Sequence, residues 1–80
     1  MSREKRPFVV YGFESTHDAL GAESLLGDMG IDVVPIPTPA SIGALCGIAL
    51  RVPPEQSERA ERYLENVGIR VSAKVNMEDF

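Results

Sequence analysis

The chain has 80 residues, 44% of them hydrophobic, and its 12 acidic and 8 basic residues give a net charge of −4. This length corresponds to a single domain, which we expect to span residues 1–80 with a structured core of about 7–75 and flexible tails at both ends. The acidic balance argues against nucleic-acid binding, which requires a basic surface, and no apolar run is long enough to cross a membrane.

The first part of the chain predicts a strand, a helix and a second strand. Residues 8–13 (FVVYGF) are rich in β-branched and aromatic side chains, which is typical of a strand. Ser15, with an acidic residue three positions on, resembles a capping box that begins a helix, and Gly30 supplies the left-handed residue that ends it. Residues 31–36 (IDVVPI) predict a second strand, placed at a sheet edge because Pro35 cannot donate a ladder hydrogen bond.

The second part of the chain repeats this order. Residues 46–52 (CGIALRV) alternate as a third strand, and Pro54 suits the first turn of a second helix that ends at Gly68. Residues 69–75 predict a fourth strand, and residues 76–80 are interpreted as a loose tail. The second helix is expected to bury one apolar stripe, made of Ala60, Leu64 and Val67.

A weak internal repeat supports this order of elements. The segment LGDMGIDV, which starts at Leu26, aligns with LENVGIRV, which starts at Leu64, an offset of 38 residues. Two βαβ halves predict the α+β arrangement βαββαβ, which is ferredoxin-like. Right-handed crossovers then give a four-stranded antiparallel sheet in the order 4-1-3-2 with two helices on one face.

The single cysteine, Cys46, follows a loop rich in proline, serine and glycine and opens the predicted third strand. One cysteine excludes an internal disulfide. Because no signal-peptide pattern is evident either, we expect a cytoplasmic protein.

The predicted topology places the start of the third strand beside the end of the first. Cys46 is therefore expected near Ser15, Thr16 and His17, with its side chain toward the helices. A helix N-terminus, hydroxyl groups and an imidazole would all favour the thiolate form of a cysteine. An inert buried cysteine is equally common, a first-turn histidine is usually solvated, and Ser15 is first of all a helix cap, so position alone leaves these interpretations open.

Other chemistries have little support in the sequence. One cysteine and one histidine cannot complete a structural zinc site, and the glycine-rich motifs of nucleotide-binding loops are absent from the sequence. We therefore expect no metal and no cofactor.

Three segments, FESTHDALGAESLL, GIDVVPIPTP and LCGIALRV, together resemble the small bacterial proteins described as selenium/sulfur carrier-like, formerly a domain of unknown function. The resemblance covers roughly residues 8–70. Its marks, in chain order, are Ser15, Thr16 and His17 at the helix start, the prolines Pro35 and Pro37, Ser41, and the pair Cys46 and Gly47. Members of this family tend to have an arginine soon after the second proline, where this chain has Thr38 and Pro39.

The resemblance implies a carrier or accessory protein rather than a stand-alone enzyme. Cys46 would accept a sulfur or selenium atom as a persulfide or selenosulfide, with Ser15, Thr16, His17, Ser41 and Gly47 as its binding surroundings. Its partners would be a donor protein similar to a cysteine desulfurase and an acceptor protein.

Two further interpretations come from other protein classes. Either Val9 and Tyr11 or Phe8 and Val10 must face away from the helices, so an apolar sheet face would suit an interaction module or a homodimer. A thiol redox sensor, in which Cys46 forms intermolecular disulfides or a sulfenic acid, is the third interpretation.

Overall fold

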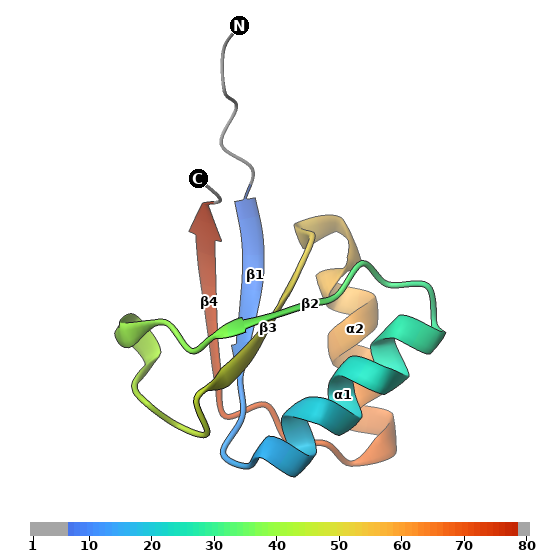
Figure 1. Cartoon of the computed structure of the whole chain (residues 1–80). Helices are drawn as coiled ribbons and strands as arrows, with labels where there is room; N and C mark the ends of the chain where they lie inside the picture. The colour runs from blue at the N-terminus through green and yellow to red at the C-terminus, as the bar shows by residue number, and fades with distance from the viewer. Residues whose placement is uncertain (1–6, 79–80) are drawn as a thin grey trace, which may run out of the picture.

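The structure is a computed structural model that describes residues 7–78 (Figure 1). Residues 1–6 and 79–80, which belong to the predicted tails, lie outside the described residues. The elements in chain order are β1 (Pro7–Gly12), α1 (Thr16–Asp28), β2 (Val34–Pro37), the short 3-10 helix η1 (Ala40–Ile42), β3 (Ile48–Val52), α2 (Pro54–Val67) and β4 (Ala73–Glu78).

The strands of residues 7–78 form one antiparallel sheet in the order β2-β3-β1-β4. The predicted order 4-1-3-2 is therefore confirmed, as is the edge position of β2. Tyr11 of β1 lies opposite Leu50 of β3 and opposite Lys74 of β4, so β1 is flanked on both sides.

The capping signals that predicted helix α1 are confirmed. The hydroxyl oxygen of Ser15 accepts a hydrogen bond from the backbone N–H of Asp18 at 3.0 Å, which satisfies one of the free donors of the first turn. At the other end Gly30 adopts a φ of 79°, a left-handed conformation that suits glycine. The buried residues of this helix are Ala19, Ala22 and Leu26.

Two predicted strand starts are wrong for the same physical reason. Ile31 donates its backbone N–H to the carbonyl of Leu26, and Ile69 donates to that of Leu64. These six-to-one bonds close helix C-termini, as in a Schellman motif, and the isoleucine that follows the glycine then packs against the core. β2 therefore begins at Val34 and β4 at Ala73, several residues later than the alternating pattern suggested.

Two further predictions are corrected by the observed bounds. β4 extends to Glu78, so residues 76–78 are strand rather than tail. β3 begins at Ile48, which leaves Cys46 in the turn before the strand. This strand starts late because Gly47 has a φ of 88°, outside the extended region that a ladder requires.

Helix α2 begins at Pro54 and is followed by Gly68, whose φ of 83° is left-handed, as predicted. Ala60 and Leu64 are buried in the core, but Val67 is 43% exposed, so the predicted apolar stripe is shorter than expected. Ile69 and Tyr63 pack against the core instead.

Both helices lie on the same side of the sheet, and η1 lies on the other (Figure 1). The buried cluster joins helix residues to Val9, Tyr11, Leu50 and Val52 of the central strands. Phe8 and Val10 therefore belong to the helix-free face, which decides between the two predicted alternatives. No helix within residues 7–78 has the length and hydrophobicity needed to span a bilayer.

Candidate functional site

The single thiol lies in a tight turn between η1 and β3. The backbone N–H of Gly47 donates to the carbonyl of Ala44 at 2.9 Å and closes the turn. Gly43, Leu45 and Gly47 all have positive φ angles, of 87°, 43° and 88°. Leu45 is the one non-glycine residue with positive φ in the described chain, a conformation that costs roughly 1–2 kcal/mol for an L-residue. The turn is thus held by surrounding contacts rather than by its own preference.

Backbone hydrogen bonds fix this turn to the rest of the fold. The N–H of Cys46 donates to the carbonyl of Phe13, which immediately follows β1, at 3.2 Å. The N–H of Thr38, which follows β2, donates to the carbonyl of Gly47 at 3.1 Å. The turn is therefore attached to the chain segments that follow β1 and β2, the two neighbours of β3, at the end of the sheet where β1 leads into α1 (Figure 1).

The side chain of Leu45 anchors the turn from the helix-free face. A Cβ atom placed on Gly12 would lie 2.6 Å from Cδ1 of Leu45 and 3.0 Å from Cδ1 of Ile42. The missing side chain at Gly12 therefore leaves the space that these two loop residues occupy. Leu45 remains 37% exposed, so part of its side chain also faces solvent.

The side chain of Cys46 is half-buried and packs against the buried cluster on the helix side, as predicted. Its Sγ donates a hydrogen bond to the carbonyl of Ile48 at 3.4 Å. The thiol is thus neither sealed inside the core nor fully exposed, and it contacts the carbonyl of Ile48 and the apolar cluster.

Three of the predicted site residues lie at the start of α1, in different environments. Ser15 is engaged as the cap of α1, and Thr16 is exposed on its first turn. The side chain of His17 is 98% exposed, with Nδ1 3.8 Å from Oδ1 of Asp18. Within residues 7–78 no hydrogen bond or ion pair joins its imidazole to Cys46, because the side chain extends into solvent.

The remaining predicted site residues lie in the connecting loop. Ser41 is an exposed residue of η1, and Gly47 forms the last position of the thiol turn. In the described part of the chain, no group of three His, Cys, Asp or Glu side chains is placed to hold a metal ion.

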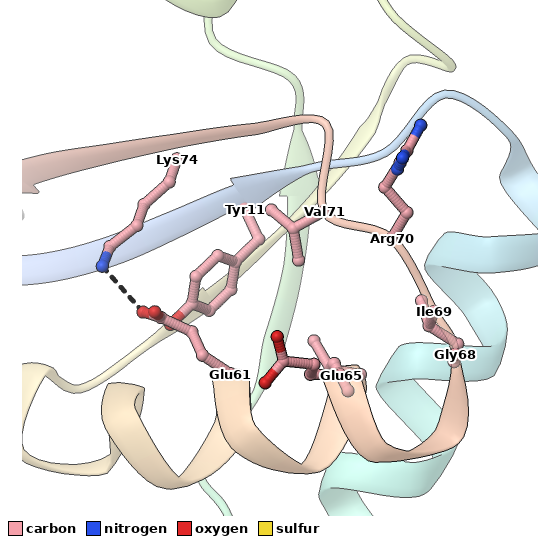
Figure 2. A pocket seen from close by; sticks show the side chains of 9 residues that line it. Tyr11, Glu61, Glu65, Gly68, Ile69, Arg70, Val71 and Lys74 are labelled. Carbon is pink, nitrogen blue, oxygen red and sulfur yellow. Dashed lines mark hydrogen bonds and ion pairs between the residues drawn. The ribbon is translucent and has the colours of Figure 1, made fainter.

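A second polar cluster lies in a cleft between α2 and β4 and was missed by the sequence analysis (Figure 2). The hydroxyl of Tyr11 donates to Oε2 of Glu61 at 2.7 Å, and Nζ of Lys74 donates to the same oxygen at 2.8 Å. The cleft has a volume of about 610 Å³, and in Figure 2 the side chain of Arg70 points away from the Lys74–Glu61 pair.

The ionisation of this cluster follows from its contacts. Burial of Tyr11, together with its hydrogen bond to Glu61 and the negative charge there, raises the pKa of the hydroxyl far above its ordinary value. Burial would also raise the pKa of Glu61, but the hydrogen bonds from Lys74 and Tyr11 outweigh that effect and lower this pKa. The tyrosine keeps its proton and the carboxylate is neutralised by Lys74, so the cluster ties α2 to the sheet.

Fold and site together define a small α+β domain that presents a single thiol on an anchored, glycine-flanked turn. The chain matches the family described as "Putative Se/S carrier protein-like" over residues 9–76. It therefore belongs to this family, which confirms the resemblance found in the sequence. No curated protein and no solved structure gives a significant match to the chain.

Proposed function

We propose that this protein carries sulfur or selenium on Cys46. The observation that carries the proposal is the position of the thiol: a half-buried side chain on a turn that is hydrogen-bonded to Phe13, after β1, and to Thr38, after β2. The family description, which names selenium and sulfur carriers in general, supports the same chemistry.

The proposed step is a transfer between sulfur atoms. The Cys46 thiolate attacks the terminal sulfur of a persulfide on a donor protein, a new S–S bond forms at Cys46, and the S–S bond of the donor breaks. The donor leaves as a thiolate, and the transferred atom keeps its proton or loses it to water. No external oxidant is required, because one persulfide replaces another.

The residues around the thiol are proposed to protect the persulfide and to contact the partner protein. Apolar packing on the core side limits the access of water and small oxidants to the persulfide, while the exposed part of Leu45 offers contact area to a partner protein. Ser15, Thr16, His17 and Ser41 are proposed as the polar residues around this contact, with His17 reaching the partner from solvent. The partners would be a donor similar to a cysteine desulfurase and an acceptor protein.

We interpret the βαββαβ arrangement as ferredoxin-like. That interpretation agrees with the antiparallel order β2-β3-β1-β4 and with both helices on one face. A fold of this kind supports many functions, so the assignment rests on the thiol site rather than on the architecture.

Mass spectrometry of the intact protein tests the proposal. The wild type is incubated with a cysteine desulfurase and cysteine, and a gain of about 32 Da, one sulfur atom per chain, is expected at Cys46. Cys46→Ser is the matched control, since it removes the single thiol and leaves the rest of the chain unchanged. An unlabelled wild type, or equal labelling of Cys46→Ser, would contradict the proposal.

An interaction module is the second candidate function. The helix-free face contains a groove of about 390 Å³, in which the guanidinium of Arg51 lies 4.3 Å from the centre of the Phe8 ring. Val10 and Met77 also line it. Partner capture that persists unchanged in Cys46→Ala and is lost in Phe8→Ser would favour this function over the carrier.

A further inference from the structure

Strand β4 forms one edge of the sheet in the described part of the chain. Within residues 7–78, β4 pairs with β1 alone. An edge strand presents a row of backbone donors and acceptors on which another strand can assemble. Natural sheets usually protect such an edge with proline, short length or charge.

The two edges of this sheet differ in protection. β2 has four residues, VPIP, and two of them are prolines without a backbone N–H. β4 has six residues, AKVNME, and contains neither proline nor glycine. The edge at β4 is therefore the one able to accept a further strand.

The side chains of β4 alternate between two environments. Ala73, Val75 and Met77 are half-buried on the helix-free face. Lys74, Asn76 and Glu78 are exposed on the helix side, where the ion pair with Glu61 fixes the direction of Lys74. A strand added at this edge would meet an apolar row on one face and a row of mixed charge on the other.

We propose that β4 pairs antiparallel with β4 of a second copy of this chain, about a two-fold axis at Asn76. In this register Lys74 lies opposite Glu78 of the other copy, and the same pair recurs on the far side of the axis. Val75 lies opposite Met77, so the apolar rows also coincide. Opposite charges and apolar pairs placed directly across an antiparallel ladder stabilise it, and an isologous interface requires this self-complementary pattern.

The contacts of Lys74 remove the main obstacle to such pairing. An inward lysine on an edge strand normally prevents association because its charge must be desolvated. Here Glu61 already binds the ammonium at 2.8 Å, so Lys74 would lie between two carboxylates in the dimer. The paired segment itself contains one lysine and one glutamate, so association does not concentrate the net charge of −4 at the interface.

Oxidative cross-linking tests the register directly. Asn76→Cys is prepared in the Cys46→Ser background, which holds no other thiol, and is treated with copper phenanthroline as oxidant. Directly opposed residues have Cβ atoms about 4.5–5.5 Å apart, close to the range for a disulfide, so a covalent dimer is expected. Glu78→Cys in the same background is the matched control and should not cross-link with itself, because its counterpart is Lys74.

Sedimentation over a range of protein concentrations gives an independent measurement without cysteine chemistry. Glu78→Lys places two lysines opposite each other on both sides of the axis and is expected to weaken dimerisation about tenfold. Asp28→Lys makes the same charge change at the exposed end of α1 and should dimerise at least as well as the wild type.

Three results would overturn the proposal: a wild type that stays monomeric at every concentration, cross-linking of Glu78→Cys but not of Asn76→Cys, or equal association of Glu78→Lys and Asp28→Lys. A dimer formed through the groove on the helix-free face would leave the two Asn76 side chains on outer surfaces, and the cross-link would be absent. The cross-linking uses chains that lack Cys46, so its outcome is independent of the carrier function.

Discussion

Replacing Tyr11 with phenylalanine isolates the polar link between α2 and the sheet. The ring of Tyr11 is fully buried and remains in place in the variant, so the change removes one hydroxyl and creates almost no cavity. That hydroxyl donates to Glu61 at 2.7 Å and approaches the carbonyl of Ser57 at 3.2 Å. The Ser57 carbonyl lies within a helix and has its own intrahelical partner. The substitution therefore acts mainly by removing the hydrogen bond to Glu61.

The size of the effect follows from the charge and exposure of Glu61. A hydrogen bond to a charged group contributes about 1.5–3 kcal/mol. The Glu61 side chain is 36% exposed and keeps its bond to Lys74, so water replaces part of the loss. We expect Tyr11→Phe to lower the free energy of unfolding by about 1–2 kcal/mol at pH 7, with a fall in Tm of about 4–8 °C for each kcal/mol.

The pH dependence of this difference has a defined sign. The pKa of Glu61 is lowered in the folded state, so its stabilisation is present above the ordinary carboxyl value of about 4.3 and is lost as the pH falls through the lowered pKa. The pKa of Tyr11 is raised, so its stabilisation is complete below about pH 10 and is lost as the pH rises further. The difference in the free energy of unfolding between wild type and Tyr11→Phe should therefore become smaller at both low and high pH.

Urea unfolding followed by circular dichroism at several pH values provides the assay. Tyr63→Phe is the matched control, because the Tyr63 hydroxyl forms no hydrogen bond within the described residues, and we expect a change below about 0.5 kcal/mol. Equal stability of wild type and Tyr11→Phe at pH 7 would refute the reasoning, as would a difference in stability that does not narrow while the pH falls through the titration of Glu61.

Two further predictions concern the cap of α1 and the thiol turn. Ser15→Ala removes the side chain that caps the Asp18 N–H and should lower the free energy of unfolding, measured in urea, by about 1 kcal/mol. Ser24→Ala, on the exposed side of the same helix, is the control and should be neutral or slightly stabilising. Equal effects of the two substitutions would argue against the cap. Gly47→Ala forces a side chain into a φ of 88° and should cost about 1–2 kcal/mol and change the rate of Cys46 alkylation. Gly27→Ala, in open space within α1, is the control; it should stabilise the protein by about 0.5–1 kcal/mol and leave the alkylation rate of Cys46 unchanged. Identical alkylation rates in Gly47→Ala and Gly27→Ala would show that the turn does not control the thiol.

Local signals in the sequence predicted the element order well. Ser15, Gly30, Pro54 and Gly68 mark helix ends through backbone chemistry that acts within a few residues, and all four positions are confirmed. The strand order could also be predicted, because the internal repeat and the handedness of crossovers leave few topologies.

The same local reasoning failed at two strand starts, because an apolar residue is found both after a helix-ending glycine and at the beginning of a strand. Ile31 and Ile69 continue an alternating apolar pattern, yet each closes the helix before it through a backbone bond. Periodicity cannot separate these uses, because a residue after a helix-ending glycine and the first residue of a strand are both apolar.

The position of the thiol could be predicted from the sequence, whereas the contacts that hold its turn could not. The sequence located Cys46 beside the end of β1, and the bond from its N–H to the Phe13 carbonyl agrees with that. Leu45 was not identified, because its role depends on the empty space at Gly12, which is distant along the chain. The exposure of His17 was likewise decided by the direction in which its side chain leaves α1.

By itself, then, the sequence determined the two helices, the four strands and their order, because caps, glycines and alternation act through short-range backbone sterics and hydrogen bonds. Three of its segments also indicated the family. Only the tertiary structure decided which side chains meet: Leu45 against Gly12, and Tyr11 with Glu61 and Lys74. Those contacts join residues that are distant along the chain, and their geometry depends on how the helices pack on the sheet. No local sequence pattern specifies that packing.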